Sequence, residues 1–404
     1  MTTKDPMPPA HVWAVFLIFL RLGLTSFGGP IAHLGYFRDE FVTRRRWLSE
    51  RSYADLVALC QFLPGAASSQ VGTVLGLSQA GLPGALAAWI GFTLPSALAM
   101  ILFALGVSRW NETIPPGLLH GLKVVAVAVV AQAVWGMART ICTDTARITI
   151  MTLSTCCVLL WPDAPGQISV IAAAAITGLL LFKPAQENAH DALPITVSRR
   201  IGVMLLGLFI VLLIGLPLIA QAWPGQTTVM MDAFYRSGSL VFGGGHVVLP
   251  LLQAEVVPKA WVSNEIFLAG YAAAQALPGP LFTFAAFLGA AMEPKSNAWL
   301  NSLVCLVSLF LPSLLLVIGV LPFWEQLRHN IRTQAALAGV NAAVVGLLLA
   351  ALYRPLWISA VYQPTDFGLA LLAFVALTSW KLPPWLVVLG SGAGGWLLSY
   401  AMIM

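Results

Sequence analysis

The sequence predicts an all-α polytopic membrane protein built from two inverted-topology repeats with broken or re-entrant helices, about 9–13 membrane segments in all. Of its 404 residues, 59% are hydrophobic and only 9% are charged. A soluble domain carries about 25% charged residues, so this composition is typical of a chain that crosses a bilayer many times. Motifs of the first half also recur in the second half in the same order, which indicates an internal repeat.

Basic residues give the chain a net charge of +5 and an isoelectric point near 9.1. These lysines and arginines are spread between apolar segments, as in the cytoplasmic loops of membrane proteins. A nucleic-acid interface gathers them on one face instead. The expected surroundings are therefore a lipid bilayer, with no nucleic-acid partner.

Thirteen apolar segments are predicted, and two of them, 147–161 and 365–379, are short for membrane helices. The polar stretch Lys183–Arg200 is the clearest linker. The predicted units are residues 1–182 (first repeat), 183–227 (linker with a connecting helix) and 228–404 (second repeat). The segments are 12–37, 53–80, 82–107, 117–138, 147–161, 167–182, 201–222, 229–252, 265–292, 297–323, 334–352, 365–379 and 383–403.

The repeat is visible at three motifs that keep their order along both halves. The segment 201–222 has no counterpart and is expected to join the halves. The matched stretches are FLRLGLTSFGG at 19–29 with FYRSGSLVFGG at 234–244, QFLPGA at 61–66 with QALPGP at 275–280, and LPS at 94–96 with LPS at 311–313.

Two membrane layouts can be compared by the positive-inside rule. If all segments cross, lysines and arginines divide 10 inside to 8 outside. If the segments 12–37, 53–80, 229–252 and 265–292 enter the membrane and return on the same side, the division is 14 to 4, with Lys4, Lys183 and the basic loop 38–51 inside and Lys295 outside. The second layout is preferred, and in both the second half is inverted.

The Gly-Gly and Pro-Gly motifs predict breaks inside apolar helices. Irregular backbone at membrane depth is tolerated where it is buried in protein or lines a wet cavity. A helix is expected to start at Pro30, and another after the break at Pro64 and Gly65. Four such helix N-termini facing one midplane cavity favour an anion. The alternative is close helix packing through small residues.

Arg21 and Arg236 lie at matched positions inside apolar segments, where an arginine is costly and usually functional. Neither is expected to find a carboxylate in its own segment, so its counter-ion is predicted to be distant in sequence or to be the substrate. Two arginines with four helix termini suggest a doubly charged oxyanion. The alternative is that the arginines extend towards the membrane interface.

Other polar residues are weaker candidates. His33 and His246 follow two of the breaks and are candidates for proton coupling, or are simply hydrogen-bonded. Lys123 is predicted to lie near an interface with a structural role. The predicted substrate-binding residues are Arg21, Phe27, Gly28, Gly29, Pro30, Gln61, Pro64, Gly65, Ser68, Ser69, Arg236, Phe242, Gly243, Gly244, Gly245, Gln275, Pro278 and Gly279.

An enzyme is a poor fit to this sequence. The stretch GLSQ at 76–79 loosely matches a pattern of intramembrane serine proteases, with Ser78 as the candidate nucleophile. Motifs for nucleotide hydrolysis or a zinc protease are absent from the sequence, and no metal or cofactor is expected. The predicted energy source for transport is an ion gradient.

These motifs resemble the chromate ion transporter family, in its long-chain form with two homologous halves. The resemblance rests on FGGP with a following histidine, RRRWLSE, Q-x-LPG in both halves, FGGGH-x-V-x-P and LPS, and it covers nearly the whole chain. It implies export of chromate across a bacterial inner membrane, chromate resistance, and coupling to membrane potential or a proton gradient. The family usually has LPGP where this chain has Ala66. A sulfate-type oxyanion carrier and a homodimer are left open.

Overall fold

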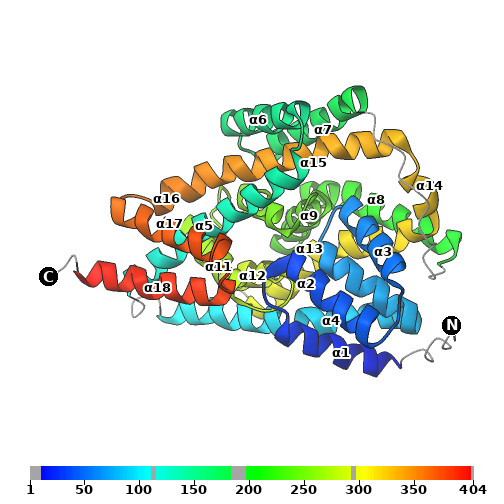
Figure 1. Ribbon diagram of the computed structural model, residues 1–404, viewed down its shortest axis with the longest axis horizontal. Helices are drawn as coiled ribbons and strands as arrows, with labels where there is room; N and C mark the ends of the chain where they lie inside the picture. The colour runs from blue at the N-terminus through cyan, green and yellow to red at the C-terminus, as the bar shows by residue number, and fades with distance from the viewer. Residues whose placement is uncertain (1–10, 111–114, 183–196, 293–296, 402–404) are drawn as a thin grey trace.

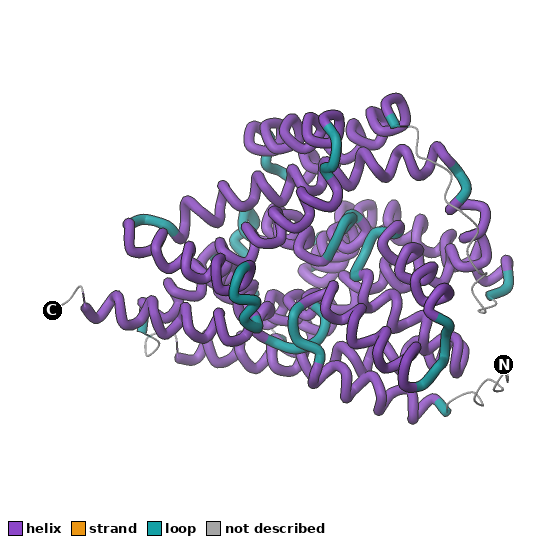
Figure 2. Tube along the Cα trace, in the orientation of Figure 1, coloured by secondary structure: helices purple, strands orange, loops and turns teal. Residues whose placement is uncertain are grey.

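The structure is a computed structural model that describes residues 11–110, 115–182, 197–292 and 297–401. Within these ranges the chain is helical, without strands, which confirms the all-α polytopic fold (Figure 2). Lys4, Lys183, Lys295 and most of the predicted linker lie outside the described residues.

The helices of the first half follow the predicted segments, with additional breaks (Figure 1). They are α1 (Val12–Thr25), α2 (Gly29–Arg38), the π-helix η1 (Asp39–Arg44), α3 (Glu50–Phe62), α4 (Ala67–Trp110), α5 (Pro116–Ile141), α6 (Thr145–Leu160) and α7 (Ala164–Leu181). Helix α8 (Arg199–Ala222) then leads to the second half.

The second half repeats this order with shorter helices around its breaks. Its elements are α9 (Gln226–Ser239), η2 (Gly245–Val247), α10 (Val248–Val256), α11 (Asn264–Ala276), η3 (Leu281–Thr283), α12 (Phe284–Ala291), α13 (Ala298–Val320), η4 (Leu321–Phe323), α14 (Trp324–Arg328), α15 (Ile331–Ala351), η5 (Leu352–Trp357), α16 (Ile358–Ala360), α17 (Pro364–Thr378) and α18 (Pro384–Ala401).

Matched serines start the third long helix of each half. The Ser49 hydroxyl accepts a hydrogen bond from the Ser52 backbone N–H, and Ser263 accepts one from Ile266. Serine is a preferred N-cap because its side chain satisfies a backbone donor that has no partner within the helix. The same local signal therefore positions α3 and α11 at corresponding places in the repeat.

Six helices of the described chain are long and apolar enough to cross a membrane. Helix α8 buries little of its surface and presents apolar side chains such as Val211 and Ile214 outward. A helix that is apolar on its outer face is suited to lipid contact. By contrast, α1 has 14 residues and α2 has 10, too few for a hydrocarbon core that needs about 20 residues.

Helix α4 is two helices joined by a sharp turn at Ala80 and Gly81, where Gly81 has φ +63°. The turn brings Gly76 against Gly84, so that a Cβ on Gly76 would lie 2.7 Å from the Ala88 Cβ. Residues eight apart in a straight helix are about 12 Å apart, so the chain reverses here. Residues 67–80 and residues 82–110 therefore run in opposite directions, as both predicted layouts require at this point.

The two halves interlock through reciprocal helix packing. Helices α6 and α7 of the first half pack on α15, whereas α17 and α18 of the second half pack on α5. Glycines allow the close approach: Gly339 meets Ala174 and Gly178 of α7, and Gly121 meets Ser391 of α18. Small residues let membrane helices pack closely. The halves are thus related by an approximate two-fold arrangement.

One end of the molecule carries the basic loop 38–51. Near it, the buried Asp55 carboxylate accepts hydrogen bonds from the Arg328 guanidinium at 2.9 Å and from Trp324 Nε1 at 3.1 Å. This contact brings α3 and α14 to the same end. Both segments belong to the side that the charge distribution assigns to the cytoplasm.

The re-entrant layout predicts one-sided chemical labelling. In a cysteine-free background, Thr43→Cys in the 38–51 loop should react with an impermeant maleimide only from the cytoplasmic side. Thr43 is exposed, so access to the reagent depends on the side of the membrane and not on burial. Gln226→Cys, at the exposed start of α9, should react only from the opposite side. Labelling of both positions from one side would contradict the layout.

Candidate functional site

Four helix breaks interrupt the described chain in pairs, as the repeat predicts. We name them the first FGG tip (Phe27–Gly29), the second FGG tip (Phe242–Gly244), the first LPG tip (Leu63–Gly65) and the second LPG tip (Leu277–Gly279). Each contains glycine at positive φ, a conformation that other residues rarely adopt, with +99° at Gly28 and +127° at Gly65. Helix α2 starts at Gly29, one residue before the predicted Pro30.

Backbone hydrogen bonds join each LPG tip to the other half. The Gly65 N–H donates to the Val241 carbonyl at 2.7 Å, and the Gly279 N–H donates to the Ser26 carbonyl at 3.0 Å. Val241 and Ser26 are matched in the repeat, as are the two glycines. Reciprocal contacts of this kind are the mark of a two-fold interface.

The residues that directly follow the two FGG tips also meet each other. A Cβ on Gly245 would lie 3.4 Å from Pro30 and 3.9 Å from Leu281, which follows the second LPG tip. All four breaks therefore form one connected group at the contact between the halves. Loops enclosed by helices are visible there in Figure 2. The structure thus brings together the predicted tip residues around Gly28, Gly65, Gly243 and Gly279.

The LPS motifs lie directly behind the LPG tips of the opposite halves. A Cβ on Gly65 would lie 2.6 Å from the Ser313 Cβ, and one on Gly279 would lie 2.7 Å from the Ser96 hydroxyl. Gln70 adds a hydrogen bond from its side-chain amide to the Pro64 carbonyl at 2.9 Å. Ser96, Ser313 and Gln70 were not predicted as site residues, although the recurrence of LPS at 94–96 and 311–313 was a signal for the two serines.

Several buried polar atoms around the tips have no hydrogen-bond partner within the described structure. A buried polar group without a partner is costly, so such groups usually meet water or a ligand. These atoms are available to hydrogen-bond water or a polar ligand. The atoms are the hydroxyls of Ser26, Ser69 and Ser313, Oε1 of Gln70 and Nε2 of Gln275.

The two candidate histidines are hydrogen-bonded in different ways. His33 is buried; its Nε2 donates to the Ser26 carbonyl at 3.1 Å, and its Nδ1 lies 3.4 Å from the Ser68 hydroxyl. His246 Nδ1 lies 2.9 Å from the Tyr271 hydroxyl. His33 is therefore part of the tip contacts, because the same Ser26 carbonyl also accepts from Gly279.

The prediction that the arginines lack a nearby carboxylate is wrong for Arg236. Its guanidinium pairs with Asp232 at 2.8 Å, one turn earlier on α9, and with Glu255 at 3.0 Å. Glu40, the counterpart of Glu255, pairs instead with Arg44 and Arg45.

Arg21 is exposed on α1, and Gln61 is exposed on α3. The structure therefore does not bring either side chain into the group of tips. Ser78, the candidate nucleophile of the enzyme alternative, donates its hydroxyl to the Leu75 carbonyl of its own helix at 2.7 Å.

A repeated helical architecture with broken helices that meet at the contact between its halves defines a class: the polytopic membrane proteins built on the inverted-repeat plan of secondary transporters. The chain belongs to the chromate transporter family, whose family model matches residues 13–179 and again residues 228–396. It is thus a member of a transporter family and a multi-pass membrane protein.

Curated relatives cover most of the chain. A protein from Pseudomonas aeruginosa called "Chromate transport protein" is 28% identical over 98% of this chain and 95% of its own length. A protein of the same name from Cupriavidus metallidurans is 24% identical over 96% of this chain and 93% of its own length. A "Probable chromate transport protein" from Synechococcus elongatus is 26% identical over 93% of each. No solved structure matches the chain.

Proposed function

We propose that this protein exports chromate across the bacterial inner membrane and thereby confers chromate resistance. The observation that carries the proposal is the meeting of four helix breaks, two from each half, around buried polar atoms that have no partner among the described residues. Helix N-termini present free N–H groups and a positive dipole end, which favour a dianion such as chromate. Family membership and the relatives named as chromate transport proteins support chromate as the substrate.

The oxyanion is proposed to bind at the FGG and LPG tips, between residues contributed by both halves. Ser68 and Ser69 begin the helix after the first LPG tip, so their hydroxyls and backbone N–H groups are suited to an anion there. Transport is coupled to membrane potential or a proton gradient, with His33 and His246 as candidates for the proton step.

Uptake of radiolabelled chromate into inside-out membrane vesicles tests this function. Vesicles that contain the protein should accumulate chromate when energised, and vesicles without it should not. Excess sulfate distinguishes the substrates: weak competition supports chromate, and complete competition supports a general sulfate-type carrier. Accumulation only in right-side-out vesicles would contradict export.

The same assay tests the tip site with Ser313→Ala. A lost hydrogen bond to a charged ligand costs about 1.5–3 kcal/mol, so the KM for chromate should rise about tenfold or more. Ser237→Ala is the matched control, because the Ser237 hydroxyl is also buried but donates to the Ala233 carbonyl of its own helix. Equal KM values for the two variants would exclude Ser313 from the site.

A further inference from the structure

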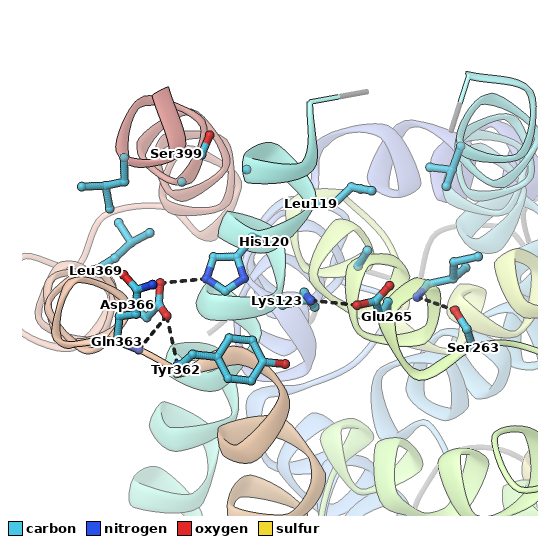
Figure 3. A pocket seen from close by; sticks show the side chains of 16 residues that line it. Leu119, His120, Lys123, Ser263, Glu265, Tyr362, Gln363, Asp366, Leu369 and Ser399 are labelled. Carbon is cyan, nitrogen blue, oxygen red and sulfur yellow. Dashed lines mark hydrogen bonds and ion pairs between the residues drawn. The ribbon is translucent and has the colours of Figure 1, made fainter. Parts of the chain in front are cut away.

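Lys123 is a buried cation whose charge is paired, among the described residues, only with a mostly exposed carboxylate. It lies on α5, and its side chain is mostly buried, with 8% of the residue exposed. Its ammonium is 3.3 Å from a carboxylate oxygen of Glu265, whose own side chain is 76% exposed (Figure 3). Within the described chain it is the one lysine in a helix long enough to cross the membrane. A charge in such a place is costly and usually functional.

The lysine faces a cavity of about 520 Å³ between α5, α11, α17 and α18. The charged and titratable groups around this cavity are Lys123 and His120 on α5, Glu265 on α11, Asp366 on α17 and Tyr362 just before it (Figure 3). His120 Nε2 is 2.7 Å from the Asp366 carboxylate, so that carboxylate already has a partner. Of the two carboxylates that line the cavity, Glu265 is therefore the one that pairs with Lys123.

The repeat gives Lys123 a structural counterpart in Asn341. The stretch GLKVVAV at 121–127 aligns with GVNAAVV at 339–345. The packing fixes this register, since Gly121 contacts Ser391 while its counterpart Gly339 contacts Ala174. Lys123 and Asn341 therefore occupy the same position in the two halves.

Asn341 lies beside the second FGG tip. Its Oδ1 is 3.7 Å from the position of a Cβ on Gly243 and is buried without a partner within the described residues. This placement follows from packing, because η2 and α10 contact α15. The matched position on α5 would reach the first FGG tip if α2 packed on α5 in the same way.

The two halves differ in this packing. In the second half, α11 contacts α5 and α18, and α10 contacts α7 and α15. In the first half, α2 and α3 pack on each other and on α4, and the described residues show no comparable interface with α5, α7, α15 or α18. Figure 1 shows α11 beside α5 and α18, with α3 placed towards α8 and α14. Inverted-repeat transporters alternate their access by moving one bundle against another.

We propose that Lys123 binds the transported oxyanion at the first FGG tip in a second conformation, in which α2 packs on α5 as η2 now packs on α15. In the present conformation the ion pair between Lys123 and Glu265 links α5 to α11. This inference rests on the proposed function. It supplies the cation that the tips otherwise lack, since Arg236 is held by two carboxylates and Arg21 is exposed.

Vesicle uptake at subsaturating chromate tests the role of Lys123. Lys123→Gln should lower uptake about tenfold or more, because it removes a charged partner of the anion. Lys123→Arg keeps the charge and should retain more uptake than Lys123→Gln. Glu265→Gln should retain more uptake than Lys123→Gln, because it keeps the ammonium that meets the anion although it removes the present partner of that ammonium. Lys381→Gln, an exposed lysine between α17 and α18, is the matched control.

The outcomes separate this inference from the proposed function. If Lys123 served only in a structural ion pair, Glu265→Gln would leave a buried ammonium unpaired and would lose at least as much uptake as Lys123→Gln; that result overturns the inference alone. Parent-like uptake by Lys123→Gln overturns it as well. No uptake by the parent overturns the proposed function. Size-exclusion profiles in detergent establish that each variant is folded. If Lys123→Gln does not fold, Lys123→Arg still tests the role of the lysine.

Discussion

Replacing Gly65 by alanine is expected to lower chromate uptake by about 30-fold or more. At φ +127° a side chain is strained, and the new Cβ would lie 2.6 Å from the Ser313 Cβ. Left-handed backbone costs about 1–2 kcal/mol for a residue other than glycine, and overpacking adds about 1–3 kcal/mol. A combined cost of at least about 2 kcal/mol corresponds to a decrease in uptake of about 30-fold if transport requires the native conformation of the LPG tip. The measurement is the initial rate of uptake in inside-out vesicles.

Because the two halves are related by the repeat, the same effect is expected at the second LPG tip. Gly279→Ala should have a similar effect, because the new Cβ would lie 2.7 Å from the Ser96 hydroxyl oxygen and the backbone of Gly279 has φ +96°. Gly207→Ala and Gly215→Ala are the controls, since both glycines lie in α8 with open space around them and should tolerate the methyl group. Parent-like transport by Gly65→Ala would show that the LPG tip does not have to keep this conformation.

Replacing Asp55 by asparagine should lower the free energy of unfolding by about 3 kcal/mol or more. Asp55 is 3% exposed, and its carboxylate accepts hydrogen bonds from Arg328 and Trp324. Without that carboxylate, Arg328 would keep, within the described chain, only its ion pair with the half-exposed Glu325 at 2.8 Å. Breaking one partner of a buried ion pair typically costs about 3–5 kcal/mol, because the remaining charge stays buried. Unfolding of the purified protein in a denaturing detergent series measures this change.

An exposed ion pair at the same end is the control. Arg38 Nε and Glu50 Oε1 are 2.6 Å apart, but both side chains are more than half exposed. Glu50→Gln should therefore change the free energy of unfolding by less than about 1 kcal/mol. Equal effects of Asp55→Asn and Glu50→Gln would mean that α3 does not depend on its buried contact with α14.

Much of the fold could be predicted from the sequence because its signals are local. The FGG and LPG motifs specify breaks through glycine and proline, and the structure has a break at each of them. The reversal of the chain at Gly81 was also predictable in outline, because Gly81 and Pro83 disfavour a continuous helix. The contact of Asp55 with Arg328 was not, since 273 residues separate them and no periodicity connects them.

The candidate site was predictable at the tips but not behind them. The pair of Asp232 and Arg236 has the i, i+4 spacing of a helical ion pair, so the sequence contained a signal for that partner of Arg236. Its second partner, Glu255, depends on how α10 folds back on α9. Gln70 and Ser313 acquire their positions only when the halves meet, and the composition around them gives no sign of that contact.

The reciprocal packing of α5 with α17 and α18 has a consequence for the order of events during synthesis. Helix α5 leaves the ribosome more than 200 residues before the two helices that cover it. Until α17 and α18 are inserted, the glycine-lined face of α5 must contact lipid, a chaperone or another chain. The first half is therefore inserted long before it is finished, and helices translated more than 200 residues later complete the surface of α5.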